Sequence, residues 1–362
     1  MKVFLVGGTG LLGEKAANIL IQRGHDVVAV ALPPIPEGAD IPKKMDLTIC
    51  DVNTISDATV KKMMKGCEAF VFASGIDERV ECPAPVFDWY IKYNVKPLER
   101  LLPLAKEMGI KKAVICGSYF SMLDDPKWGY KKKLPKKGLK ERNPYIRARL
   151  IQEEVVKNAC DENFDAAVLE LPYIFGTQPG RQPVWTVLID QLVGMDKLPF
   201  TMYPHGGTAM LTVRQVGQSI AGAVEKLGKE FKGFYAWPIA MYNMDWRHFL
   251  KIIYRGRGMS KNRRIMSVPG WMMRMGVKGI IKEYEAKGIE SGLDPKYLPY
   301  IMNLKLYIDN KYAKDLGVTE DDIEAAIFDS VKVSTACCTG EAKLVQMKGE
   351  MTEEEKKQYN VK

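Results

Sequence analysis

The chain has 362 residues, 46% hydrophobic and 27% charged, which excludes disordered and fibrous proteins and allows one large or two modest domains. The seven cysteines follow no metal-ligand spacing, and no apolar run reaches the roughly 18–20 residues of a membrane span. The net charge of +9 permits contact with nucleic acid or an anionic substrate and requires neither. We expect no metal, and without an evident leader or span we expect a cytoplasmic protein.

The chain opens on a short apolar run, Val3–Val6, that ends in spaced glycines at Gly7, Gly10 and Gly13. An amphipathic stretch and a second apolar run follow, so the order predicted is strand, glycine turn, helix, strand. In such a unit the first glycine permits a tight turn, the second lets the backbone approach a pyrophosphate, and the third lets the helix pack closely. The free N–H groups at the helix start would face the phosphates. We therefore expect a dinucleotide site.

Apolar runs of strand length alternate with helix-length segments through the first half of the chain. The expected strands are Lys2–Val6, Asp26–Val30, Leu47–Cys50, Ala69–Ala73, Lys112–Cys116 and Ala166–Glu170. The expected helices are Glu14–Arg23, Ser56–Met64, Phe87–Glu107 and Ile146–Glu162. Pro97 and Pro103 predict a kink or break in the third helix. This alternation predicts an α/β fold, a Rossmann-type doubly wound parallel sheet with helices on both faces.

The strand–helix rhythm loosens after Gly176. We expect a dinucleotide-binding Rossmann domain over residues 1–170, a smaller, mostly C-terminal α/β substrate lobe over 171–334, and a polar tail over 335–362 that is a loosely attached helix or disordered. The helix Thr212–Leu227 is expected to return to the first domain. Further expected elements are a strand, Phe234–Trp237, and helices over Met244–Arg255, Trp271–Lys287 and Thr319–Ser330, the last with Thr319 as N-cap.

A serine, a tyrosine and an arginine are the candidates for catalysis. Ser118 follows an expected strand at its carboxyl end, where such sheets bind their ligands. Tyr145 and Arg149, four residues apart on an expected helix, share one face. The three side chains can therefore converge near a nicotinamide. The alternatives are a turn or helix-cap role for Ser118 and a surface position for Arg149.

These motifs, in this order, resemble the extended short-chain dehydrogenase/reductase family, which includes sugar-nucleotide epimerases, 3β-hydroxysteroid dehydrogenases and cinnamoyl-CoA-type reductases. The resemblance covers roughly residues 1–330 and rests on Gly7–Gly13, Cys50–Val52, Phe72–Gly75, Tyr93–Val95, Leu171–Gly176 and Asn310–Gly317, besides Ser118 and Tyr145. It implies cofactor contacts from Gly7, Thr9, Gly10, Leu11, Leu12, Gly13, Asp51, Val52, Ala73, Ser74, Gly75, Asn94, Tyr145, Arg149, Pro172 and Ile174. By analogy it also implies a homodimer.

The chain departs from the family's Tyr-x-x-x-Lys motif, because Arg149 stands where the lysine is expected. In the family that lysine bonds the nicotinamide ribose and lowers the pKa of the tyrosine, which is about 10 when free. Arginine supplies a permanent charge and several donors, so Arg149 can perform both tasks. The expected mechanism has Ser118 and Tyr145 stabilise a carbonyl oxygen while Tyr145 exchanges a proton and hydride passes to or from the nicotinamide.

The choice of cofactor depends on the end of the second strand. That region reads Val30-Ala31-Leu32-Pro33-Pro34 and carries neither the acid that selects NAD nor an arginine. Because no carboxylate there would repel a 2′-phosphate, we expect NADP, with NAD as the alternative. Lys43 and Lys44 could reach the phosphate, or belong to a solvated loop.

Two further features bear on the substrate. The basic stretch Lys127–Arg142 lies between Ser118 and Tyr145, so it is expected near the mouth of the site, attracting an acidic substrate, or else as a solvated loop. The C-terminal third concentrates Met, Trp and Tyr, which suit a bulky apolar ligand or an ordinary core. We expect Trp271–Ile281 to cover a substrate pocket rather than to lie on a membrane surface.

The predicted function is an NAD(P)-dependent oxidoreductase that interconverts a carbonyl and an alcohol on a bulky small molecule, acidic or apolar, such as a steroid or a CoA ester. The alternatives are a nucleotide-sugar epimerase or dehydratase, and a redox-silent cofactor-binding or RNA-binding scaffold of the same fold. Nucleic acid is not the expected partner, since the basic stretch carries few interleaved aromatic residues.

Overall fold

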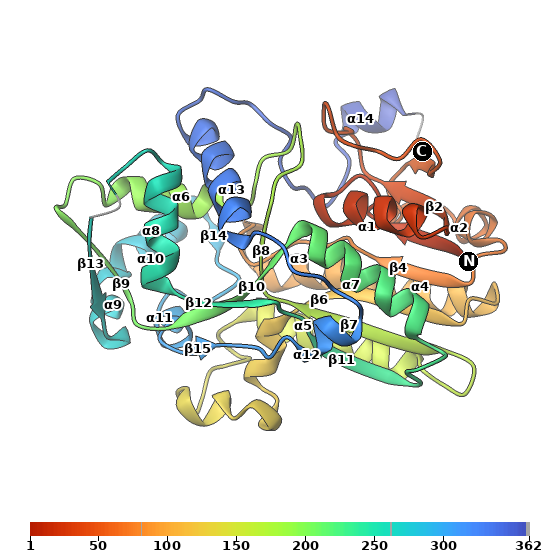
Figure 1. Cartoon of the computed structure of the whole chain (residues 1–362), viewed down its shortest axis with the longest axis horizontal. Helices are drawn as coiled ribbons and strands as arrows, with labels where there is room; N and C mark the ends of the chain where they lie inside the picture. The colour runs from red at the N-terminus through yellow and green to blue at the C-terminus, as the bar shows by residue number, and fades with distance from the viewer. Residues whose placement is uncertain (81, 261–262, 360–362) are drawn as a thin grey trace.

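The computed structural model describes residues 1–80, 82–260 and 263–359, and over these its largest sheet has seven strands, all parallel. Across this sheet the order is β11 (Phe234–Pro238), β7 (Asp165–Leu171), β6 (Lys112–Ser118), β4 (Ala69–Phe72), β1 (Lys2–Val6), β2 (Asp26–Ala31) and β3 (Asp46–Ile49). The order reverses direction between β1 and β4, where such sheets bind ligands at the carboxyl ends of the strands. The predicted doubly wound Rossmann-type sheet is confirmed (Figure 1).

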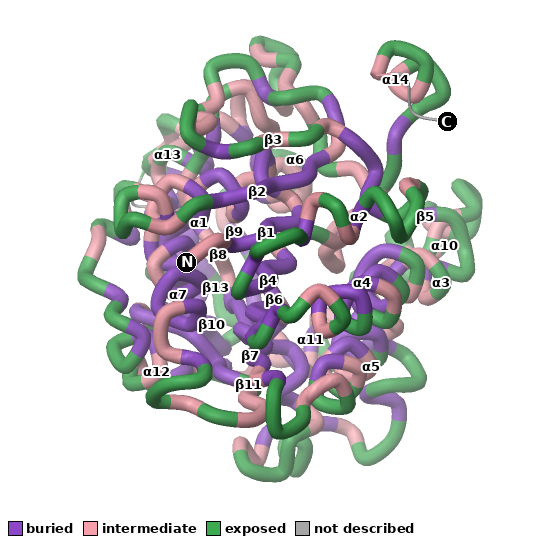
Figure 2. Tube along the Cα trace, turned by 90° about the vertical axis from the view of Figure 1, so that its right-hand side faces the viewer, coloured by how far each residue is buried: buried purple, intermediate pink, exposed green. Residues whose placement is uncertain are grey.

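Helices cover both faces of this sheet because successive strand side chains point to opposite sides. Val3 and Leu5 of β1 pack with α1 and α7, whereas Phe4 and Val6 pack with α2, α4 and α5. These helices are α1 (Leu11–Gln22), α2 (Asp57–Met64), α4 (Lys96–Glu107), α5 (Pro144–Ala159) and α7 (Val213–Lys226). Figure 2 shows the central strands buried between the two helical layers.

The long helix expected over Phe87–Glu107 is divided. It consists of α3 (Val86–Tyr90), a wider helical turn over Ile91–Val95, and α4. Pro97 lies in the first turn of α4, where a missing N–H is tolerated, so the helix restarts there as expected. Pro103 does not end the helix.

The remaining strands form smaller sheets beside the carboxyl end of the large one. A second sheet has the order β12 (Tyr242–Asp245), β10 (Gly207–Thr212) and β15 (Lys305–Leu306), with β8 (Tyr173–Phe175) also paired to β10. The two-stranded pairs are β9 (Phe200–Pro204) with β13 (Arg264–Val268), and β5 (Cys82–Pro83) with β14 (Ile289–Glu290). The associated helices are α6 (Thr186–Gly194), α8 (Trp246–Gly256), α9 (Gly270–Gly276), α10 (Lys278–Lys287), α11 (Leu298–Met302), α12 (Lys311–Asp315) and α13 (Ile323–Cys338).

Several helix starts differ from the expectation because another residue provides the cap. Asp245 caps α8, so Met244 belongs to β12. Asp322 caps α13 by accepting from the Ala325 N–H, and Thr319 is not the N-cap. The helix expected from Trp271 to Lys287 is divided at Val277 into α9 and α10. Thr212 caps α7 through a reciprocal pair of bonds with Gln215, and α7 packs along α1 (Figure 1).

The C-terminal segment was expected as a loose helix or a disordered tail, and this expectation is wrong in two ways. Helix α13 continues to Cys338, beyond the expected end at Ser330, so both adjacent cysteines lie in that helix. Beyond it the chain crosses the molecule, pairs its backbone with residues 180–182, and ends in α14 (Glu353–Gln358). Within the described ranges, no helix has the length and apolar character that crossing a membrane requires.

Candidate active site

The glycine turn between β1 and α1 forms one end of the site. Gly7 has φ 93°, and a Cβ added there would press on the carbonyl of Ala73. A Cβ on Gly13 would overlap the Gly7 carbonyl, so both positions require glycine for packing. Gly10 differs, because an added Cβ would meet only the Gly7 oxygen, at 3.2 Å. As the N-cap of α1, Gly10 has no side chain to occupy the first N–H groups, which stay available to an anion.

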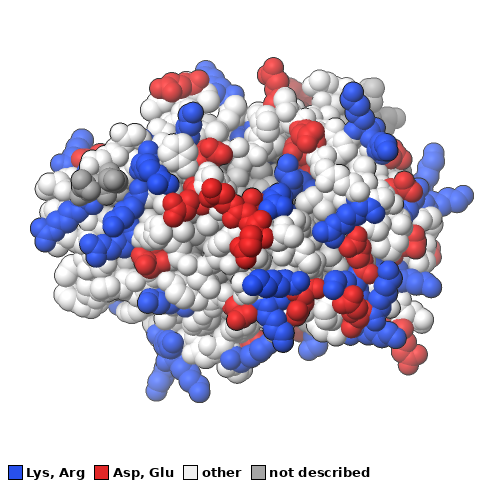
Figure 3. Space-filling model, in the orientation of Figure 1, with Lys and Arg blue, Asp and Glu red and all other residues white. Residues whose placement is uncertain are grey.

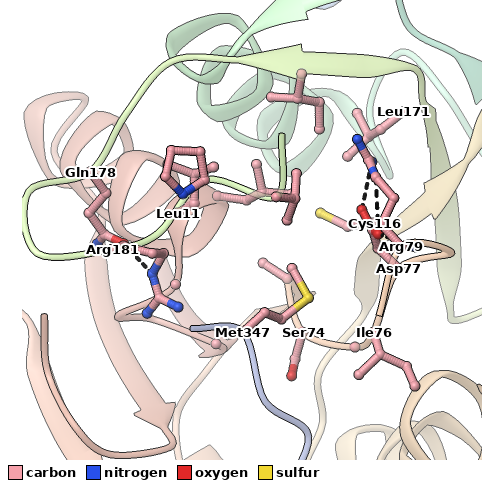
Figure 4. A pocket seen from close by; sticks show the side chains of 18 of the residues that line it. Leu11, Ser74, Ile76, Asp77, Arg79, Cys116, Leu171, Gln178, Arg181 and Met347 are labelled. Carbon is pink, nitrogen blue, oxygen red and sulfur yellow. Dashed lines mark hydrogen bonds and ion pairs between the residues drawn. The ribbon is translucent and has the colours of Figure 1, made fainter. Parts of the chain in front are cut away.

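A large cavity extends from this turn along the carboxyl ends of the strands, with side chains from both halves of the chain around it (Figure 4). The expected site residues that line it are Gly7, Thr9, Gly10, Leu11, Leu12, Ala73, Ser74, Gly75, Ser118, Tyr145, Arg149, Pro172 and Ile174. Asp51 and Val52 line a smaller adjoining cavity, which shares Gly7, Ala31 and Leu32 with the large one.

Two of the expected cofactor contacts lie behind the walls instead. Gly13 packs on Gly7, and Asn94 is fully buried. The Asn94 side chain accepts a hydrogen bond from the Ile76 N–H at 2.8 Å and donates to the Ile76 carbonyl at 3.0 Å. Asn94 therefore fixes the loop after β4. Neither Gly13 nor Asn94 is among the described residues that line the two cavities.

Ser118, Tyr145 and Arg149 lie together in the large cavity. Ser118 ends β6, and its hydroxyl also accepts a long hydrogen bond from the Phe120 N–H, so the capping alternative is realised alongside the site position. The pKa of Tyr145 is raised to about 12, chiefly by burial. The charge of Arg149 opposes this rise, Glu78 and Asp77 add to it, and a hydrogen bond with Ser118 opposes it. Tyr145 is therefore protonated at neutral pH.

Arg149 is buried, not a surface cation, so that alternative is wrong. Its guanidinium donates to Gln152 Oε1 at 2.8 Å and makes long contacts to the carbonyls of Cys116 and Ile76. In the described part of the chain, its buried Nε has no partner. A buried donor without a partner is energetically costly, so Arg149 is held in this position at some expense of stability.

A charged loop after β4 was missed by the sequence reasoning. Asp77, Glu78 and Arg79 line the cavity, and Arg79 pairs with Glu78 and with Asp77, the latter pair being drawn in Figure 4. Burial raises the pKa of Glu78 to about 7, although Arg79 lowers it. The Arg79 guanidinium stacks over Trp185, 4.5 Å from the ring centroid. In the sequence, this loop could have been found only from its position directly after the Phe72–Gly75 segment.

A second missed group holds the glycine turn from the other side. Gln178 donates to the Thr9 carbonyl at 3.1 Å, and Arg181 donates to the same oxygen at 3.2 Å. Arg181 also bonds Gln178 Oε1 at 2.6 Å, and both line the cavity (Figure 4). A cation thus lies beside the phosphate-binding turn. In the sequence, Gln178 and Arg181 could have been found only from their position shortly after the Leu171–Gly176 turn.

Three features that could have lain near the site lie outside its described walls, which leaves the solvated-loop alternative for the basic stretch and for Lys43 and Lys44. The basic stretch Lys127–Arg142 supplies none of the described lining residues, since Lys131 and Lys140 pair with Asp124 and Arg142 pairs with Asp294. Trp271 and Met275 of α9 are about three-fifths exposed and lie outside the described walls of the two cavities at the site. Lys43 and Lys44 are exposed and lie outside the described walls of both cavities.

The residues present fit a nicotinamide dinucleotide. The turn at Gly10 is free of side chains, which suits a diphosphate, and Arg181 lies beside it. At the other end Ser118, Tyr145 and Arg149 line the same cavity. Basic and acidic side chains are interspersed over the face shown in Figure 3. A nucleic-acid-binding surface would instead be predominantly basic.

Comparisons with known proteins agree with this fold. Residues 3–208 match the NAD dependent epimerase/dehydratase family. The crystal structure of gox2253 is similar with a TM-score of 0.67 and 18% identity, over 94% of this chain and 99% of that one. UDP-glucose 4-epimerase from Bifidobacterium longum in complex with NAD+ and UDP has a TM-score of 0.62 and 15% identity, over 94% and 100%. MoeE5 in complex with UDP-glucose and NAD has a TM-score of 0.61 and 14% identity, over 93% of this chain and 100% of that one. No curated protein matches the sequence.

Proposed function

Since the chain belongs to the NAD dependent epimerase/dehydratase family, we propose that it exchanges hydride between a nicotinamide cofactor and a carbon that bears a hydroxyl or carbonyl, with Tyr145 as the acid and base. One observation carries this proposal: Ser118, Tyr145 and Arg149 line the same cavity that begins at the glycine turn. Net interconversion of a carbonyl and an alcohol is the reaction that this set of side chains supports best.

Each side chain has a defined task. Tyr145, protonated at neutral pH, donates its hydrogen to the substrate oxygen. Ser118 adds a second hydroxyl to the same oxygen and stabilises the charge that develops there. Arg149 lines the cavity, where its guanidinium would donate to the cofactor, and its guanidinium carbon lies 5.0 Å from the Tyr145 ring centroid. The cofactor, when bound, supplies or accepts the hydride.

The substrate end of the cavity combines aromatic and charged groups. Tyr119, Phe120 and Tyr173 line it, together with the Asp77–Arg79 loop. Within the described residues, Arg79 Nη1 is buried without a partner, and the Arg79 side chain stacks on Trp185. These features support a bulky substrate whose apolar body contacts the rings and whose polar or acidic group reaches Arg79.

A second candidate is an epimerase or dehydratase that retains its cofactor between turnovers. The observation that favours it is the C-terminal segment, since residues 345–348 line the large cavity and would cover a bound dinucleotide. The two candidates differ in whether cofactor is consumed. A redox-silent scaffold would bind the cofactor and lack both activities.

The test is a panel of steroids, CoA esters and nucleotide sugars, assayed with NAD(H) and NADP(H) by the absorbance of the reduced nicotinamide and by product analysis. An oxidoreductase changes the absorbance in proportion to product. A retained-cofactor enzyme yields an isomer or a dehydrated product at constant absorbance. Turnover that survives unchanged in Tyr145→Phe would contradict the proposed chemistry.

A further inference from the structure

The segment Val345–Met351, which we call the strap, crosses from one side of the cofactor cavity to the other. At its first end the Val345 N–H donates to the Gly180 carbonyl at 2.9 Å, and the Val345 carbonyl accepts from the Gln182 N–H at 2.9 Å. Gly180 and Gln182 flank Arg181, the cation that bonds the glycine turn at Thr9. The strap is thus attached by backbone bonds next to the proposed diphosphate site.

At its other end the strap is fixed to the turn between α3 and α4. The Glu350 carboxylate accepts from Lys92 Nζ at 2.7 Å and from the Tyr93 hydroxyl at 2.8 Å. Gly349 lies flat on the Tyr93 ring, because an added Cβ would come within 2.9 Å of three ring atoms. Met351 is buried. Side-chain pairing, close packing and burial therefore all hold this end.

Between its two attachments the strap forms a wall of both cavities. Met347 lines the large cavity opposite the glycine turn (Figure 4), and Lys348 lines the large and the small one. The small cavity also contains Leu32, at the end of β2, and Asp51. In this fold the end of β2 is where the ribose 2′ position is recognised. Lys348 is therefore the strap residue placed at that position.

Among the described walls of the small cavity, Lys348 is the one cation and Asp51 the one carboxylate. Leu32 and its neighbours Ala31 and Pro33 offer no carboxylate to the 2′-hydroxyl. Lys348 pairs with Glu355 of α14, and Thr352 and Glu355 cap that helix reciprocally, so the ammonium is held where it lines the cavity. An ammonium group has three N–H donors, so Lys348 can keep Glu355 and still donate to a phosphate.

We infer that the strap is part of the cofactor site and that Lys348 is its specificity-determining residue, favouring the 2′-phosphate of NADP(H) over the 2′-hydroxyl of NAD(H). This inference rests on the proposed function, since it concerns the same cofactor. The strap closes the adenosine end through Met347 and Gly349, and Lys348 distinguishes the two dinucleotides by charge.

The test measures dissociation constants of NADPH and NADH for the full chain by calorimetric titration at fixed ionic strength. Lys348→Ala should weaken NADPH by about tenfold, the effect of one lost charge-assisted contact, and leave NADH within about twofold. Lys343→Ala is the matched control, because Lys343 is an exposed lysine two residues before the strap and lies outside the described walls of both cavities. It should change neither constant.

Gly349→Val tests the strap without shortening the chain. The new side chain would collide with the Tyr93 ring and displace the strap, so both dinucleotides should weaken, and NADPH by the larger factor because Lys348 moves with the strap. Equal effects of Lys348→Ala on NADPH and NADH, an equal effect of Lys343→Ala, or unchanged binding in Gly349→Val would each overturn the inference. A wild-type chain that binds neither dinucleotide would overturn the proposed function itself, and the inference with it.

Discussion

The Arg149 guanidinium carbon lies 5.0 Å from the centroid of the Tyr145 ring, one helical turn along α5. Burial raises the pKa of Tyr145 and the arginine charge lowers it, and the net result is a pKa of about 12. Burial therefore outweighs the nearby cation, and the phenol keeps its proton over the physiological range. In the proposed reaction, Tyr145 therefore holds the proton that a substrate oxygen would receive.

Tyr145→Phe removes the proton donor and keeps the ring beneath Arg149. We expect turnover to fall by about 10²–10⁴-fold, the usual contribution of a positioned acid. Cofactor affinity should stay within about twofold, because Arg149 and the glycine turn are untouched. Steady-state kinetics and calorimetry measure the two quantities. Tyr130→Phe is the control, since the Tyr130 hydroxyl bonds the carbonyls of Lys305 and Tyr307, away from the cavity.

Arg149→Lys restores the side chain of the family's usual motif. We expect activity to be kept or raised, because an ammonium group supplies the charge and can reach the same space. The lost bond to Gln152 should lower stability by about 1 kcal/mol. Turnover and thermal unfolding give the two readouts. An inactive Arg149→Lys with normal cofactor affinity would show that the forked guanidinium is required.

Gly10→Asp places a carboxylate where a diphosphate is expected. The backbone tolerates a Cβ there, since the nearest atom is the Gly7 oxygen at 3.2 Å, so the variant should fold. We expect nucleotide binding to be lost through charge repulsion and blocked access. Gly13→Ala provides the contrast, because its Cβ overlaps the Gly7 carbonyl and should destabilise the fold by more than about 1 kcal/mol. Unchanged titration of Gly10→Asp would remove the turn from the site.

Glu78 makes the stability depend on pH. Burial raises its pKa from 4.5 to about 7, so between these values the folded state binds more protons than the unfolded state. Stability must then fall as the pH rises through this window, by an amount on the order of 3 kcal/mol. Glu78→Gln, which mimics the protonated form, should remove this decline. Denaturant unfolding at several pH values tests it, with exposed Glu341→Gln as the control.

The sequence was sufficient for the large sheet because its strands are continuous apolar runs that end in glycine or polar residues. It was less reliable at helix starts, where several nearby residues can cap. Thr319 and Asp322 both have capping side chains, and Thr319 instead contacts Gln218 and Arg214 of α7. Local pattern cannot decide between two caps when a tertiary contact does.

The site was predictable where its residues belong to local motifs. Ser118 and Tyr145 follow from a strand end and a helix start, and both line the cavity. Arg181 and Lys348 could not be found in this way, because they approach the glycine turn and the end of β2 from more than 150 residues away along the chain. Glu78 adjoins a recognised motif, but only its burial distinguishes it from a surface carboxylate.

The attachment of Val345 to residues 180–182 and of Glu350 to Lys92 and Tyr93 limits how far the cleft can open. Glu350 is the fifth residue after Val345, and a fully extended chain over these five steps spans about 17 Å. Any hinge motion beyond that reach must first detach one end. Opening of the cleft beyond this distance therefore requires release of the strap at one end. The rate of ligand exchange would then be limited by the rate at which the weaker of the two attachments breaks.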